Sequence, residues 1–140
     1  MNHYSFEDIK VGQTISFEYE LNQEKMDMFK KITGDENPLH NNLEYAKKAG
    51  YSEKVVYGML TSAILSTLAG VYLPGEYSLI HSVEIDFVKP VYLSKCPLTI
   101  EAKVSELEER FKVFKLKYTI RDCEGTKVSK GTMQIGFTNK

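Results

Sequence analysis

A carboxylate, an amide and an imidazole occur within six residues around a proline, which is an arrangement suited to moving protons. These side chains belong to Asp35, Asn37 and His40, in the stretch Gly-Asp-Glu-Asn-Pro-Leu-His. Histidine is the side chain best suited to proton transfer near neutral pH, and carboxylates are its frequent partners in acid–base catalysis. Taken singly, residues of these types usually only cap helices or form turns. Their combination favours acid–base chemistry over a purely structural role.

The elements on either side of this segment should hold it as a rigid loop. Residues 23–33 have the apolar spacing of an amphipathic helix, and Gly34 fits the left-handed position that closes helices. Pro38 disfavours helical angles in the residue before it, so residues 35–37 are predicted to form a turn.

A second helix should begin directly after the histidine. Asn41, with Glu44 three residues later, has the pattern of a capping box, and Gly50 is a suitable end for a helix of about two turns. Asp35 and His40 would then flank one loop. Asp35 is expected to lie just past a helix C-terminus and to face an apolar tunnel, where it would be a stronger base than a solvated carboxylate.

The rest of the chain predicts an α+β fold in a single domain spanning residues 1–140. Residues 58–70 are apolar on nearly all sides, which is typical of a buried helix too short to cross a bilayer. An antiparallel sheet wrapped around this central helix is the most economical burial, with a helical insert at about 22–50 carrying the loop. Five segments alternate apolar and polar residues as strands do: 13–20, 79–88, 97–107, 111–122 and 126–138.

Charge and composition exclude several classes of function. Eighteen Lys and Arg against nineteen Asp and Glu give a net charge of -1, which argues against nucleic acid or an anionic membrane as a partner. The N-terminus does not resemble a signal peptide and no apolar run is long enough for a membrane helix, so a cytoplasmic location is expected. Cys96 and Cys123 lack metal-ligand spacing, so no metal site is predicted. His3 and His81 are interpreted as structural or solvent-facing.

The loop resembles the signature of the MaoC-like family of (R)-specific enoyl-CoA hydratases and dehydratases. That pattern is an aromatic residue, two residues, an aliphatic residue, Ser or Thr, Gly-Asp-x-Asn-Pro, an aliphatic residue, His, five residues and Ala. The similarity continues through residues 55–60 and 87–91, although many members have His where Tyr57 stands. The signature positions are filled by Phe29, Ile32, Thr33, Gly34, Asp35, Asn37, Pro38, Leu39, His40 and Ala46.

The resemblance implies a hotdog fold and the reversible hydration of trans-2-enoyl thioesters to (R)-3-hydroxyacyl thioesters, without a metal or organic cofactor. Asp35 and His40 would together hold one water, and which of them is the formal base stays open. Coenzyme A and acyl carrier protein are both possible carriers of the acyl group, whose length is not predicted. A hotdog thioesterase and a non-catalytic acyl-thioester binding subunit are alternative functions. Hotdog domains generally pair edge to edge, so a homodimer or a larger assembly is expected.

Two further residues are candidates for stabilising or orienting the reacting groups. The Gly58 N–H would lie at the start of the buried helix, where free donors and the helix dipole favour the negative charge of a thioester oxyanion. Ser66 occupies the position at which the family has a serine bonded to the catalytic aspartate, which makes it the candidate to orient Asp35. It could equally bond its own helix backbone, and Ser62 is a weaker rival.

The other candidates concern the loop and the substrate. Asn37 is expected to fix the loop through bonds to its backbone. Tyr57 either shapes specificity or packs in the interior. Lys89, in Val-Lys-Pro-Val, matches a family position and is the candidate cation for phosphates of the carrier at the tunnel mouth.

Overall fold

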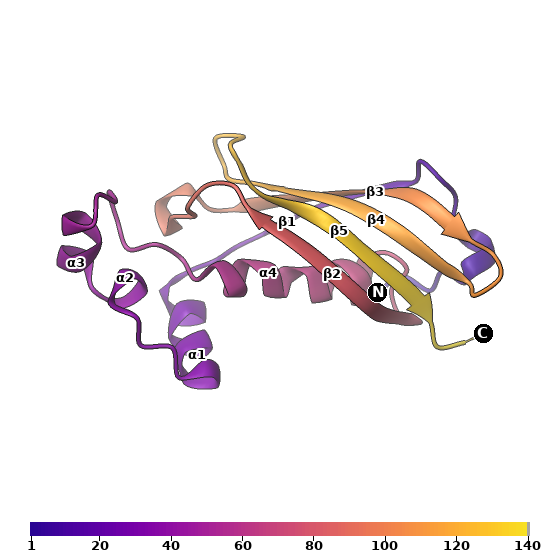
Figure 1. Cartoon of the computed structure of the whole chain (residues 1–140), viewed down its shortest axis with the longest axis horizontal. Helices are drawn as coiled ribbons and strands as arrows, with labels where there is room; N and C mark the ends of the chain where they lie inside the picture. Colours follow the sequence, from indigo (N-terminus) through magenta and orange to yellow (C-terminus); the bar gives the residue numbers. More distant parts are fainter. Residues whose placement is uncertain (140) are drawn as a thin grey trace.

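Five antiparallel strands form one curved sheet in the order β1-β3-β4-β5-β2. The computed structural model describes residues 1–139 (Figure 1). All five strands lie close to their predicted bounds, because the alternation of apolar and polar residues is regular along each of them. Their bounds are β1 Thr14–Tyr19, β2 Ser78–Phe87, β3 Leu98–Glu108, β4 Val113–Arg121 and β5 Lys127–Phe137.

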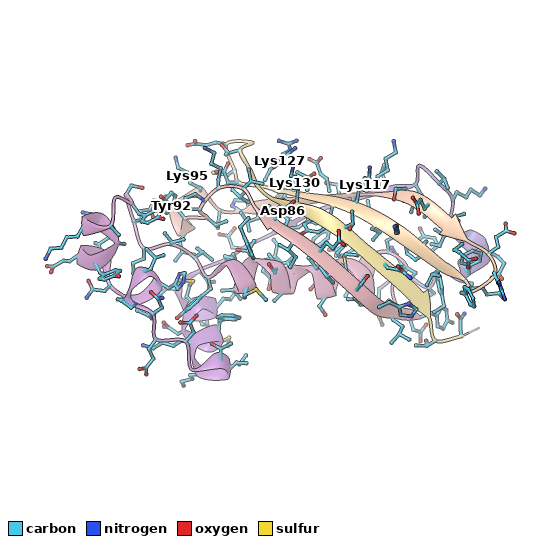
Figure 2. The ribbon with its side chains drawn as sticks, in the orientation of Figure 1. Asp86, Tyr92, Lys95, Lys117, Lys127 and Lys130 are labelled. Carbon is cyan, nitrogen blue, oxygen red and sulfur yellow. The ribbon has the colours of Figure 1, made fainter. Side chains whose placement is uncertain are left out.

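One face of the sheet is apolar and buried, and the other is polar. Ala102 of β3 lies opposite Tyr118 of β4, and both are buried. Lys117 and Lys130 are exposed and extend from the face opposite the core (Figure 2). The buried side chains of the three central strands include Ile100, Val104, Leu116, Ile120, Met133 and Ile135.

A single apolar helix fills the concave side of the sheet. Helix α4 covers Gly58–Thr67 and continues as a short π-helical segment, η2, over Leu68–Tyr72. Figure 1 shows it running along the sheet, and Leu65 and Leu68 are buried in the common core. The predicted arrangement of a sheet wrapped around a helix at about 58–70 is confirmed.

Within one chain this helix is not covered on every side. The sheet covers only one side of α4, and the opposite side is open. Met59, Ala63 and Ser66 recur on that open side and are exposed. Apolar residues on two faces of one helix therefore need a second covering surface.

The predicted helical insert lies beyond the N-terminal end of α4 (Figure 1). Helix α1 covers Gln23–Thr33, as predicted. The Asn22 side chain caps its start, and Gly34 closes its end with a φ of 72° in the left-handed region. Ile32, in the last turn of this helix, is 82% exposed.

The second part of the insert differs from its prediction. A one-turn helix, α2, covers Pro38–Asn41, and helix α3 follows over Leu43–Lys48. Asn42, rather than Asn41, caps α3 by accepting a hydrogen bond from the Tyr45 N–H at 3.0 Å. A single helical turn is too short to give a periodic pattern, so the sequence pointed to a continuous loop there.

Short elements join the termini and the strands. The 3₁₀ segments η1, Phe6–Asp8, and η3, Leu93–Lys95, precede β1 and β3 respectively. His3 forms an isolated bridge with Gly75, where an added Cβ would meet the Asn2 carbonyl oxygen at 2.0 Å. Within residues 1–139 the helices are all too short or too polar to cross a membrane.

Candidate active site

The predicted loop is held by its own short polar side chains. Asp35 follows the α1 C-cap, and its carboxylate accepts a hydrogen bond from the Asn37 N–H at 3.0 Å. The Asn37 side chain accepts one from the Leu39 N–H at 2.9 Å and thereby caps α2. Asn37 therefore bonds to the loop backbone, as predicted.

Tyr57 anchors this loop to the start of α4. Its side chain is 2% exposed, and its hydroxyl donates a hydrogen bond to the Asp35 carbonyl oxygen at 2.6 Å. The same hydroxyl accepts a bond from the Asn41 side chain at 3.0 Å. Its ring centroid lies 4.3 Å from that of His40 and 4.8 Å from that of Phe29. Sequence reasoning missed this positioning role, for which no local pattern exists.

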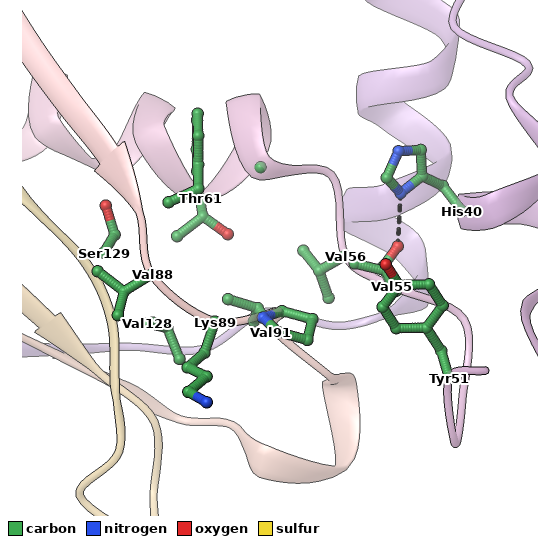
Figure 3. Close-up of a pocket in the computed structure, with 13 residues that line it drawn as sticks. His40, Tyr51, Val55, Val56, Thr61, Val88, Lys89, Val91, Val128 and Ser129 are labelled. Carbon is green, nitrogen blue, oxygen red and sulfur yellow. Dashed lines mark hydrogen bonds between the residues drawn. The ribbon is translucent and has the colours of Figure 1, made fainter. Parts of the chain in front are cut away.

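The tautomer of His40 follows from one hydrogen bond. Its Nδ1 lies 2.7 Å from the Val55 carbonyl oxygen (Figure 3). A carbonyl oxygen only accepts hydrogen bonds, so Nδ1 must carry the hydrogen. In the neutral ring Nε2 is then unprotonated, and it can accept a proton.

Gly58 supplies a free backbone donor beside these groups. It is the first residue of α4, where N–H groups lack partners within the helix. No residue among 1–139 accepts a hydrogen bond from the Gly58 N–H. A Cβ at this position would lie 2.9 Å from a ring carbon of Phe87, so a larger residue would have to displace that ring.

Two adjoining cavities meet at His40, Gly58 and Phe87, which line both of them. The first cavity holds about 500 Å³ and also contains Asp35. The second holds about 260 Å³ and extends between α4 and the sheet. The side chains of Asp35 and His40 and the free N–H donor of Gly58 thus border one space. This arrangement can transfer protons next to a carbonyl group and stabilise negative charge on its oxygen.

The remaining candidates lie at different distances from this space. Lys89 is exposed and lines the second cavity. Ser66 is exposed on the open side of α4, about two turns and 12 Å along the helix from Gly58, and it lines neither cavity. One protomer therefore does not bring Ser66 to Asp35. Asp35 itself is exposed, so the expected burial in an apolar tunnel is wrong for a single protomer.

Comparison with protein families decides the class of this domain. The family model described as "MaoC like domain" matches residues 7–124, which is most of the chain. The chain belongs to the MaoC-like family.

Two relatives of this MaoC-like domain are named as a hydratase and a dehydratase of acyl-CoA thioesters. It is 30% identical over 120 residues to an (R)-specific enoyl-CoA hydratase of Rhodospirillum rubrum, covering 84% of this chain and 82% of that protein. It is 29% identical over 102 residues to a 3-hydroxybutyryl-CoA dehydratase of Methylorubrum extorquens, covering 73% of this chain and 64% of the relative.

A solved structure shares the fold of the MaoC-like domain. The (R)-hydratase from A. caviae involved in PHA biosynthesis superposes with a TM-score of 0.86 at 26% identity, over 92% of this chain and 97% of that one. The hotdog architecture expected from the sequence is confirmed. Within the described part of this MaoC-like chain, no group of three or more His, Cys, Asp or Glu is placed to hold a metal ion.

Proposed function

We propose that this MaoC-like domain is a hydro-lyase that reversibly hydrates trans-2-enoyl thioesters to (R)-3-hydroxyacyl thioesters. The observation that carries the proposal is the convergence of three groups on one space: the Asp35 carboxylate, the His40 imidazole and the free N–H of Gly58. The names of the hydratase and dehydratase relatives agree with this chemistry.

The reaction follows from what each group can do. The thioester oxygen accepts a hydrogen bond from the Gly58 N–H, which stabilises the enolate-like charge that develops on it. Asp35 and His40 both accept hydrogen bonds from one water and thereby sharpen its oxygen as a nucleophile. The water adds its hydroxyl to C3 of the alkene and returns its proton to C2 on the same face, so no atom is left over. Dehydration is the same path in reverse.

Both coenzyme A and acyl carrier protein present the acyl group on a pantetheine arm that ends in phosphate. Lys89 is exposed at the second cavity, beside the proposed thioester position at Gly58. A cation there would pair with a carrier phosphate, which supports entry of the pantetheine arm from this side. The acyl tail would then extend past His40 into the larger cavity.

The apolar surface left open on the protomer supports a homodimer. Strand β2 is an edge strand with β5 as its sheet neighbour. Unpaired edges with apolar side chains are surfaces that proteins cover by pairing. The exposed apolar residues on this side of the molecule include Met59, Ile80, Val83 and Phe87.

A dimer of this kind would also complete the site. Met59 and Phe87 line the cavity that contains Asp35, yet their side chains are 61% and 56% exposed. A second copy over this face would exclude water from the cavity and bury Asp35. An orienting role for Ser66 would then require contact across the interface.

The cytoplasmic location expected from the sequence stays a prediction.

Crotonyl-CoA separates hydration from the two alternative functions. Hydration removes the enone absorbance and yields (R)-3-hydroxybutyryl-CoA without releasing a thiol. A thioesterase would instead release free coenzyme A as a thiol and leave crotonate, with its double bond intact. A non-catalytic binding subunit would bind the thioester and turn nothing over. The proposal predicts the first outcome, and either of the others would contradict it.

A further inference from the structure

Two buried hydroxyl groups near the site have no hydrogen-bond partner. Thr61 and Ser129 are 1% and 2% exposed, and neither side-chain oxygen has a partner among the described residues. Buried polar groups are nearly always paired, because an unpaired one loses its bonds to water without replacement. Such exceptions call for a physical explanation.

Helix α4 does not leave every buried hydroxyl without a hydrogen bond, as it does that of Thr61. Its neighbour Ser62 is also buried and donates a hydrogen bond to the Gly58 carbonyl oxygen at 2.9 Å, one turn back along α4. Threonine in a helix commonly makes the same bond. The Thr61 hydroxyl instead points away from the helix, into the second cavity (Figure 3).

Both hydroxyls line that second cavity, which is otherwise mainly aliphatic. Ser129 lies on β5, across from the helix, beside the Tyr118 phenol but without a hydrogen bond to it. The aliphatic lining consists of Val55, Val56, Val88, Pro90, Val91 and Val128. An apolar cavity with two neutral hydroxyls suits a ligand with methylene groups and a few uncharged polar atoms.

We propose that this cavity binds the pantetheine arm of the substrate, with the Thr61 hydroxyl accepting a hydrogen bond from the amide N–H nearest the thioester. The Ser129 hydroxyl donates to the carbonyl oxygen of the same amide. This inference rests on the proposed function, since it takes the thioester oxygen to lie at the Gly58 N–H. The chemical step itself needs neither the Thr61 nor the Ser129 hydroxyl.

The spacing along the helix matches the spacing along the ligand. Thr61 is three residues beyond Gly58, which is about 4.5 Å along the helix axis. In a pantetheine thioester the amide nitrogen lies four bonds from the thioester carbon. An extended chain covers roughly 1.3 Å per bond, so the amide nitrogen lies about 5 Å away. A thioester carbonyl at Gly58 therefore brings the amide to the level of Thr61.

A pair of small substrates tests for recognition of the amide N–H. Crotonyl-N-acetylcysteamine contains the amide, whereas the S-(2-acetoxyethyl) thioester of crotonic acid replaces its N–H by an ester oxygen. We expect the wild-type kcat/KM to be about two- to tenfold higher for the amide, which corresponds to one net hydrogen bond. In Thr61→Val the ratio should fall to about one. Ser62→Ala is the matched control, because its hydroxyl bonds the helix, and it should keep the wild-type ratio.

Equal kcat/KM for the amide and the ester in the wild-type protein would overturn the inference, as would an unchanged ratio in Thr61→Val. Butyryl-CoA, which cannot be hydrated, gives a readout that does not need turnover. Calorimetry should show its binding weakened about two- to tenfold by Thr61→Val, and unchanged binding would again contradict the inference. Failure to hydrate any crotonyl thioester would instead overturn the proposed function.

Thr61→Val also tests whether the contact is made by the pantetheine arm or by the rest of the carrier. The arm is common to coenzyme A and acyl carrier protein, so Thr61→Val should lower kcat/KM by a similar factor for crotonyl-CoA and for a crotonyl carrier protein. A loss confined to one carrier would contradict the inference. The wild-type ratio between these two substrates reports which carrier is preferred.

Discussion

The Tyr57 hydroxyl holds together two segments that lie far apart in the chain. It donates to the carbonyl oxygen of Asp35 and accepts from Asn41, and so joins the start of α4 to the loop that carries Asp35 and His40. A buried residue with these contacts controls where the Asp35 carboxylate lies without taking part in the chemistry.

Replacing Tyr57 by Phe should therefore impair catalysis more than binding. Tyr57→Phe removes both hydrogen bonds but keeps the ring between Phe29 and His40. We expect kcat for crotonyl-CoA hydration to fall roughly tenfold while KM changes little, with a loss of about 1 kcal/mol in the free energy of unfolding. Steady-state kinetics and urea unfolding measure the two quantities. Tyr45→Phe, at an exposed position on α3, serves as the control; an equal fall in kcat there would contradict the assignment.

Sequence reasoning at this scale found the groups that carry a local pattern. Asp35, Asn37 and His40 are close in the chain, and the turn chemistry of proline and asparagine predicted how the loop is held. The partners of that loop, Tyr57 and Val55, come from a distant segment. Contacts of this kind depend on how the elements pack, and no spacing in the sequence predicts them.

At the scale of the elements, strand β4 carries Tyr118, whose phenol is buried. Burial raises the pKa of Tyr118 from its ordinary value of 10.0, and the charge of Asp86 acts in the same direction. The folded protein keeps the proton at a pH where the unfolded chain has lost it. The contribution of Tyr118 to stability is therefore present below pH 10.0 and is lost as the pH rises toward the folded pKa.

Tyr118→Phe tests this alkaline sensitivity. The wild-type protein should lose up to about 1.4 kcal/mol of unfolding free energy per pH unit above pH 10.0, relative to the variant. Below that pH the two proteins should differ by a constant amount. Urea unfolding between pH 7 and 11 provides the comparison, in which the other titrating groups cancel. Parallel curves across the whole range would show that Tyr118 does not titrate as described.

Helices and strands with long, regular sequence patterns were predicted more accurately than short ones. Strands with regular alternation and the eleven-residue helix α1 appear where expected. The one-turn helix α2 is too short for a periodic signal, and the cap of α3 is displaced by one residue from Asn41 to Asn42. Helix α4 was predicted as a buried helix under the sheet, but its apolar sequence does not say which surface covers each of its faces.

At the scale of the whole molecule, the open apolar face predicts self-association through β2. Val83→Lys places a charge on the apolar face of this edge strand, at a side chain that is 38% exposed. We expect sedimentation velocity to show a dimer for the wild-type protein and at least a tenfold weaker dimer for the variant. Val11→Lys, at an exposed position in a turn before β1, should leave the dimer intact. A wild-type monomer, or an unaffected Val83→Lys dimer, would contradict this use of the edge.

The central claim is that the Asp35 and His40 loop of this MaoC-like domain hydrates an enoyl thioester. The most direct test is the initial rate at which crotonyl-CoA loses its enone absorbance, measured for the wild-type protein and for Asp35→Asn. Removing a general acid–base group should lower kcat roughly 10²- to 10⁴-fold. Glu36→Gln, the adjacent exposed carboxylate that lines neither cavity, should keep the wild-type rate. An Asp35→Asn protein that is folded and turns over within a few-fold of the wild-type rate would contradict the claim.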